Sequence, residues 1–339
     1  MSQKIKIMIL GGARENGKNM YAVQVEDEIF IMDAGLKYPD SSLLGIDVVI
    51  PDLQFFQDYA DKIAGIFLTH GHADSIGALP YILRDHDIPV FGSKLTIELA
   101  KIAIQRENRR RKNDLFHVID ADTEIEFKNA NVSFFKTTHS IPDSLGIDIS
   151  TKEGEIVYTG DFKFDPSAKK GYRTDFVRLS EIAQKGVLAL LSDSTNAEAN
   201  FPNDRQTSIE KYIYNIFENY DGRIIAAAKA SNIVRVQEIF QAAAATGRHV
   251  FLTGRDAGKI VYTAMKLGYL NVPKGLLVHS KDLKKIPDNE LVILETGRMG
   301  EPLKSLQKMA TNRHRMIKIK KGDLVFIATT PSQSVETMV

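Results

Sequence analysis

The chain has 339 residues, with 44 Lys and Arg against 43 Asp and Glu, and it contains no cysteine. This length predicts two domains, each able to bury a core of its own. The lack of cysteine excludes disulfides and thiolate metal sites and fits a reducing compartment. No apolar run approaches the roughly 18–20 residues of a membrane span, and no signal-peptide core follows Met1. We therefore expect a soluble, cytoplasmic protein.

The charges are unevenly distributed along the chain. From Glu198 onward there are 21 Lys and Arg against 14 Asp and Glu, whereas the residues before it carry 23 against 29. A basic second half favours an anionic partner, and an acidic first half suits a cation-binding site. A solvated basic face is the alternative explanation.

The first elements along the chain are short strands. We predict strands at 5–10, 20–25, 29–32, 46–51 and 65–68, and a helix over 53–63. The glycine-rich loop between the first two strands matches neither Gly-x-Gly-x-x-Gly nor a P-loop, so it predicts a turn between antiparallel strands rather than a nucleotide site. Asp33 ends the third strand, where it either orients a ligand histidine or serves as a turn carboxylate.

The stretch Thr69-His70-Gly71-His72-Ala73-Asp74-Ser75 joins the strand at 65–68 to a helix that starts near Ile76. Two histidines one residue apart on extended backbone project to the same side, and a carboxylate at the following turn can close on the same point. Imidazole nitrogen and carboxylate oxygen suit zinc, and manganese accepts the same donors. The alternative is a polar loop in which Asp74 or Ser75 caps the helix.

Further polar residues follow later strands of the first half. We predict strands at 88–93, 116–120, 124–127, 132–137 and 154–159, a buried strand at 187–191, and a helix over 95–104. His139, Asp161 and Asp193 each stand just after one of these strands. Together with His70, His72 and Asp74 they predict one rim of a β-sandwich, where loops converge. The run at 109–112 predicts either a contact with a nucleic-acid backbone or a solvated helix end.

After a polar linker at 198–205, strands alternate with helices. We predict helices at 207–218, 232–244 and 303–311 and another after Arg255, with strands at 223–228, 249–252, 291–294 and 324–328, an order typical of a mainly parallel α/β domain. Ser231 and Asn232 lie at a strand-to-helix turn where N–H groups suit a phosphate, although capping by Ser231 is the alternative. Arg235 could reach the same anion or remain solvated. The chain stops at Val339 just past a strand, as if cut in mid-fold.

Several of these strings resemble known motifs. His70-Gly71-His72-Ala73-Asp74, His139 and Gly160-Asp161 resemble motifs two to four of the metallo-β-lactamase superfamily, and Asp33-Ala34-Gly35 is similar to its first motif. Longer strings across the whole chain resemble the ribonuclease J family: Lys18-Asn19-Met20-Tyr21, Asp47-Val48-Val49-Ile50-Pro51-Asp52, His139-Ser140-Ile141-Pro142-Asp143-Ser144, Thr159-Gly160-Asp161-Phe162-Lys163-Phe164-Asp165, Leu191-Ser192-Asp193-Ser194-Thr195, Ala230-Ser231-Asn232-Ile233 with Arg235 and Gln237, and Gly300-Glu301-Pro302.

The resemblance implies an α/β fold: a metallo-β-lactamase αββα sandwich with an inserted β-CASP α/β domain. Residues 1–197 would be the N-terminal portion of the metallo-β-lactamase domain, and 198–339 most of the β-CASP domain. In the family the chain then returns to complete the catalytic domain, bringing a late metal-ligand histidine and the loop that cradles the RNA 5′ phosphate. Those parts are absent from this sequence.

The resemblance also implies a two-metal site, with zinc, manganese or magnesium as the ion. His70, His72, His139 and a bridging Asp161 would hold the first metal, and Asp74, Asp161 and two further histidines the second. Active members have a histidine directly after the aspartate, where this chain has Ser75, a poor substitute for imidazole on zinc. We assign the chemistry to Asp74, His139 and Asp161, and substrate binding to Asp193, Ser231, Asn232 and Arg235.

By resemblance, the protein would be a metal-dependent ribonuclease with 5′-to-3′ exonuclease and further endonuclease action in rRNA processing, RNA maturation and mRNA decay. Ser75 predicts that the protein has low activity by itself and works with a more active paralogous ribonuclease J subunit. The assembly would be a hetero-oligomer, a homodimer or both. One alternative is a largely non-catalytic RNA-binding scaffold in such a complex. Another alternative is a small-molecule hydrolase of the superfamily. The basic second domain argues against it, because a small substrate needs no such clamp.

Overall fold

The structure is a computed structural model of the full chain, and it describes residues 2–39, 45–107, 113–165, 168, 172–195, 197–198, 205–254, 256–297 and 302–329. The basic run at 109–112 and residues 300–301 of the string ending in Pro302 lie outside these ranges. The chain divides into two compact units, Met1–Ala197 and Glu198–Val339. Among the described helices, none is long and apolar enough to cross a lipid bilayer.

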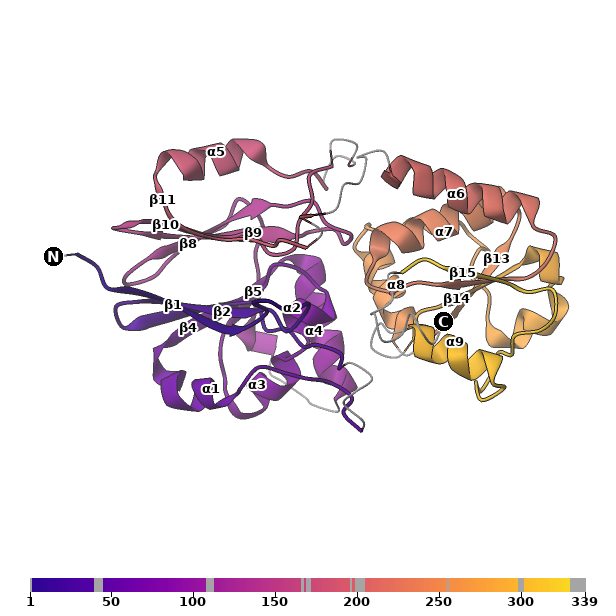
Figure 1. Cartoon of the computed structure of the whole chain (residues 1–339), viewed down its shortest axis with the longest axis horizontal. Helices are drawn as coiled ribbons and strands as arrows, with labels where there is room; N and C mark the ends of the chain where they lie inside the picture. The colour runs from indigo at the N-terminus through magenta and orange to yellow at the C-terminus, as the bar shows by residue number, and fades with distance from the viewer. Residues whose placement is uncertain are drawn as a thin grey trace. The chain divides into compact units, whose positions relative to one another are not determined.

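The first unit is built on two face-to-face sheets (Figure 1). The first sheet has the order β1-β2-β3-β4-β5-β6. Its strands are β1 (Ile5–Gly11), β2 (Met20–Val25), β3 (Glu28–Met32), β4 (Ile63–Phe67), β5 (Val90–Gly92) and β6 (Phe116–Val118). The pairs β1–β2 and β2–β3 are antiparallel and the later pairs are parallel, so β3, β4 and β5 end at the same edge of the sheet.

The second sheet has the order β11-β10-β9-β8-β7. Its strands are β7 (Glu124–Glu126), β8 (Asn131–Lys136), β9 (Leu145–Thr151), β10 (Gly154–Tyr158) and β11 (Val187–Leu191). Helices cover the outer faces: α5 (Phe176–Gln184) lies over this sheet, while the first sheet carries α1 (Gln54–Tyr59), α2 (Ala73–Ile76), α3 (Leu79–Asp85) and α4 (Lys94–Arg106) (Figure 1). Two 3₁₀ turns, η1 (Ala60–Lys62) and η2 (Asn113–Leu115), complete the unit.

The main core of this unit lies between the sheets. Side chains alternate across each strand, so one face of each sheet points inward. The inward residues form one buried cluster that includes Val23, Phe30, Phe67, Val132, Phe134, Ile147, Ile149 and Ile156. Phe30 and Phe67 have ring centroids 6.2 Å apart, and Phe67 and Phe134 6.3 Å apart. This packing keeps the ends of strands from both sheets close together at one rim.

The second unit contains a parallel sheet of order β13-β14-β12-β15. Its strands are β12 (Ile224–Ala227), β13 (His249–Thr253), β14 (Leu291–Glu295) and β15 (Leu324–Ile327). The helices are α6 (Arg205–Asn219), α7 (Ile233–Ala245), α8 (Ala257–Lys266) and α9 (Pro302–Ala310), with 3₁₀ turns η3 (Ser280–Lys285) and η4 (Asp288–Glu290). Figure 1 shows α6 and α7 on one side of this sheet and α9 on the other.

The predicted fold class is confirmed, but several elements differ from the predictions. The predicted strand at 46–51 is reduced to one isolated bridge between Lys37 and Val49. The strand β9 and the helix α5 were not predicted at all. The strand at 187–191 was predicted to be buried, which is wrong: β11 is the edge strand of its sheet, and Val187, Leu188 and Leu190 are exposed.

Candidate metal centre

The candidate ligands of the first unit all follow strands at one rim. His70 comes three residues after β4 ends, His139 three residues after β8, and Asp161 three residues after β10. His72 is the N-cap of α2 and has extended backbone (φ −77°, ψ 158°), which brings Asp74 into the first turn of that helix. The structure therefore brings together the five residues that the sequence proposed as ligands.

The distances between these side chains are short enough for shared coordination. Ligand atoms of His70, His72 and His139 lie within 4.8 Å of one another, and so do those of His70, Asp74 and Asp161. Nε2 of His139 is 3.1 Å from Nδ1 of His72. Nε2 of His70 is 3.7 Å from Asp74 Oδ1 and 4.0 Å from Asp161 Oδ2. His70 therefore belongs to both groups.

His70 carries the clearest sign that this cluster suits a metal. Its Nε2 and Asp74 Oδ1 are buried and have no hydrogen-bond partner in the described part of the chain. Burial lowers the pKa of His70 to about 3, so its imidazole is neutral and Nε2 can offer a lone pair. Buried polar atoms without partners are costly, and a bound cation would satisfy both atoms. Three imidazoles and two carboxylates are a donor set that zinc and manganese accept.

A buried network behind His70 fixes its ring. The Asp33 carboxylate accepts hydrogen bonds from the Thr69 backbone N–H (2.8 Å), the Thr69 hydroxyl (2.9 Å) and the Tyr158 hydroxyl (2.9 Å). Thr69 Oγ1 is also 2.9 Å from His70 Nδ1. Because Thr69 donates its single hydroxyl proton to Asp33, it can only accept from Nδ1–H, and this assignment leaves Nε2 free for a metal. Asp33 thus orients His70 through Thr69.

The segment that carries Asp33 also supports the ligand loop through its backbone. Ala34 N–H donates to Ser75 O at 2.7 Å, and Leu36 N–H donates to Ala73 O at 3.0 Å. A Cβ atom on Gly35 would lie 1.5 Å from the carbonyl oxygen of Asp74, so only glycine allows this approach. The Asp33-Ala34-Gly35 string is therefore required by both hydrogen bonding and close packing.

Ser75 occupies a position that the sequence did not reveal. Its side chain is fully buried, and Oγ lies 3.3 Å from Nδ1 of His70. That nitrogen is on the opposite side of the ring from Nε2, the atom that faces Asp74 and Asp161. In this arrangement the Ser75 hydroxyl contacts the His70 ring on its Nδ1 side.

The remaining sequence candidates are held by local contacts. Asp193 Oδ1 accepts from Thr195 N at 2.7 Å, which is a turn within its own loop. In the second unit Asn232, rather than Ser231, caps α7, accepting from Arg235 N at 3.0 Å. The Arg235 guanidinium pairs with Glu238. Their substrate-binding roles stay predictions.

Sequence reasoning did not identify Thr69 or Tyr158 as supports of the centre. For Thr69, the available signal was a hydroxyl directly before the first histidine of the motif. Tyr158 offered no comparable signal, because its contact with Asp33 joins residues 125 positions apart.

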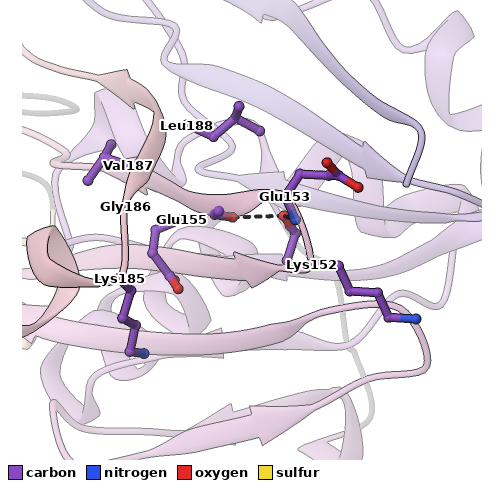
Figure 2. A pocket seen from close by; sticks show the side chains of 9 residues that line it. Lys152, Glu153, Glu155, Lys185, Gly186, Val187 and Leu188 are labelled. Carbon is purple, nitrogen blue, oxygen red and sulfur yellow. Dashed lines mark hydrogen bonds between the residues drawn. The ribbon is translucent and has the colours of Figure 1, made fainter. Parts of the chain in front are cut away.

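A separate surface hollow lies at the other end of the second sheet (Figure 2). Its volume is about 440 Å³, and its lining comes from the β9–β10 turn and the start of β11: Thr151, Lys152, Glu153, Gly154, Glu155, Lys185, Gly186, Val187 and Leu188. None of the candidate site residues lines it, so this hollow is distinct from the metal centre.

Comparison with known proteins decides the family. The sequence profile of the metallo-beta-lactamase superfamily matches residues 13–211, and the profile described as "Ribonuclease J, beta-CASP domain" matches residues 221–339. A protein named Ribonuclease J 2 from Streptococcus pyogenes is 56% identical over 99% of this chain. The chain belongs to the ribonuclease J family. Membership in the metallo-β-lactamase superfamily implies metal binding, and the residues around His70 are a group that could hold the ion.

Other relatives agree with this membership. Ribonuclease J 2 from Staphylococcus epidermidis is 44% identical over the whole chain. The chain spans 61% and 60% of the lengths of these two ribonuclease J relatives. The fold is also similar to a crystal structure described as a protein of unknown function from Enterococcus faecalis V583, with a TM-score of 0.66 and 13% sequence identity. The alignment covers 97% of this chain and 88% of the Enterococcus faecalis chain. That likeness concerns the fold alone.

Proposed function

We propose that this chain carries the metal centre of a metal-dependent ribonuclease that degrades RNA from the 5′ end and also cleaves internally, in RNA maturation and mRNA decay. The observation that carries the proposal is the convergence of three histidines and two aspartates at one rim, with the buried Nε2 of His70 aimed at Asp74 and Asp161. The substrate class comes from relatives named Ribonuclease J 2.

We further propose zinc as the bound ion, with manganese as the competing metal, because imidazole and carboxylate together suit both. A divalent metal here supplies Lewis acidity and lowers the pKa of water, so no nucleophilic side chain is needed. His70, His72, His139 and Asp161 would form the complete ligand group. The Asp33–Thr69 network would hold His70 in the tautomer with a free Nε2.

Low activity of the isolated protein follows from the position of Ser75. Active members of the family place a histidine there, whereas the Ser75 hydroxyl lies against Nδ1 of His70. A second metal held mainly by Asp74 and Asp161 would lack that imidazole. The same observation favours the second candidate function, a largely non-catalytic RNA-binding subunit that assembles with a paralogous ribonuclease J.

The test is the metal content and RNA degradation of the full-length protein, compared between wild type and two variants. We expect Ser75→His to raise bound zinc or manganese from one to two equivalents, and to raise the rate of degradation of 5′-monophosphorylated RNA. We expect His72→Ala to lose bound metal and degradation together. His117→Ala is the matched control, because it removes an exposed histidine on β6.

The two candidate functions give opposite results in this test. A ribonuclease loses activity with His72→Ala and keeps it with His117→Ala. A scaffold binds RNA equally well in wild type and in His72→Ala, and degrades it in neither. Two equivalents of metal in wild type would contradict the proposed role of Ser75.

A further inference from the structure

Three phenylalanine rings, two of them exposed, form a cluster next to the candidate metal centre. Phe162 directly follows the ligand candidate Asp161, and its ring centroid is 5.1 Å from that of Phe164. The ring of Phe164 is in turn 5.4 Å from that of Phe176, the first residue of α5. Phe164 is 60% exposed and Phe176 is 57% exposed. Rings this exposed add little to the core of the unit, and more than half of the Phe164 and Phe176 surface is accessible to a ligand.

Backbone contacts fasten both sides of this cluster to the loop that carries His139. The carbonyl of Thr138 accepts from Lys163 N at 2.9 Å. Thr174 N donates to the Thr138 hydroxyl at 2.9 Å, and Thr138 N donates to the Thr174 hydroxyl at 3.2 Å. The residue just before a candidate metal ligand therefore also positions the chain on either side of the rings.

Lysine side chains lie beside the cluster in the chain. Lys163 stands between Phe162 and Phe164, where its amine pairs with Asp165 at 3.1 Å. Lys136 is exposed at the end of β8, and its carbonyl accepts from the N–H of Asp175, the residue before Phe176. Aromatic faces with neighbouring cations are the combination that binds single-stranded nucleic acid, because bases stack on the rings while amines approach the phosphates.

We propose that Phe164 and Phe176 form a stacking platform for unpaired bases of single-stranded RNA bound at the metal centre. The inference rests on the proposed ribonuclease function and deepens it, since it names the side chains that would hold the unpaired bases of the substrate. Every base has a π face, so stacking selects single strands without reading sequence. A protein surface could also cover an apolar patch, but the aromatic composition, the lysines and the tether to the His139 loop favour RNA.

The test measures RNA affinity in the absence of cleavage. Full-length protein is titrated, without divalent metal and with EDTA, into a fluorescent 5′-monophosphorylated single-stranded RNA, and anisotropy gives the dissociation constant. We expect Phe164→Ala and Phe176→Ala each to weaken binding about tenfold, and Phe164→Trp to retain it. Val177→Ala is the matched control, because Val177 is the aliphatic neighbour of Phe176 and is 71% exposed. Its affinity should match that of wild type.

Abasic RNA separates stacking from other contacts. Removal of the stacked bases should weaken wild-type binding and abolish the difference between wild type and the alanine variants. The platform is overturned if wild type binds RNA but the alanine variants bind equally well, or if their defect persists on abasic RNA. Unchanged RNA affinity together with an altered oligomeric state would assign the rings to a protein interface. Complete failure of wild type to bind RNA, both with EDTA and with zinc or manganese restored, would instead refute the proposed function.

Discussion

Two buried carboxyl groups of the first unit, Asp33 and Asp148, have the same raised pKa of about 7 but different surroundings. Burial is the main cause in both. Around Asp33, hydrogen bonds from Thr69 and Tyr158 oppose the rise in pKa. Around Asp148, the neighbouring carboxyl of Glu155 adds to it through charge and hydrogen bonding, and Ser133 supplies a hydrogen bond at 3.1 Å.

The difference lies in what each group supports. The Asp33 network ends on Nδ1 of His70 and fixes a candidate metal ligand. The pair of Asp148 and Glu155 lies beneath α5, and Glu155 lines the hollow at the far end of the sheet (Figure 2). One oxygen of each carboxyl in this pair is buried and receives no hydrogen bond from an N–H or hydroxyl group of the described residues, which leaves the two carboxyl groups to share a proton. A raised pKa alone therefore does not locate a functional site; the partners of the group decide its role.

The largest effect should come from Asp33→Ala. The substitution would leave the buried Thr69 N–H and Tyr158 hydroxyl without their acceptor, at a cost of about 1–3 kcal/mol for each group. It would also release the His70 ring, and loss of such support typically lowers metal affinity about 10–100-fold. Urea denaturation and metal titration of the full-length protein measure the two losses.

Asp33→Asn is the sharper variant of the same experiment. It keeps an acceptor oxygen for Thr69 but loses the charge, so stability should fall less than with alanine while metal affinity still falls. Equal metal affinity in wild type and both variants would show that His70 needs no support from Asp33.

At the second carboxyl the expected sign is reversed: Asp148→Asn should stabilise the protein at neutral pH. The pKa of Asp148 is about 7 in the folded protein against an ordinary 3.8, so the folded state holds a proton that the unfolded chain releases as pH rises above about 4. The stability associated with this proton is complete below that pH and is lost progressively up to about pH 7. Asparagine cannot ionise, and its amide can donate to Glu155.

The gain should be on the order of 2–4 kcal/mol at pH 8 and should vanish near pH 4. Urea denaturation across this pH range measures it. Asp122→Asn is the control, because it removes the same charge from an exposed turn and should leave stability unchanged at every pH. A gain from Asp148→Asn that does not vary with pH would contradict a shared proton in the pair.

The two carboxyl groups also show what the sequence can and cannot predict. His70, His72, Asp74, His139 and Asp161 were identifiable because each follows a strand at short range and carries a metal-binding side chain. Asp33 was noted for the same reason, with its role left open. The contact from Tyr158 was not predictable because it depends on how the two sheets pack.

The acid pair was missed because its strand was missed. Leu145-Gly146-Ile147-Asp148-Ile149 lies just beyond the loop that contains Pro142, and no element was predicted there. Asp148 on β9 and Glu155 on β10 are adjacent only through the antiparallel register, in which Ser150 opposes Glu155. Similarly, the apolar run of β11 indicated burial, whereas its position at the sheet edge depends on the order of all five strands.

The smallest effect should come from Lys185→Met, which removes the cation whose charge opposes the raised pKa of Asp148. Without Lys185 the pKa of Asp148 should rise further, and the loss of stability should extend to slightly higher pH. Because Lys185 is exposed, solvent and salt screen it, and the change in stability should be only a few tenths of a kcal/mol. In the Asp148→Asn background the same substitution should have no pH-dependent effect. An equal effect in both backgrounds, or one that persists in high salt, would mean that Lys185 acts through packing and that the acid pair does not sense it.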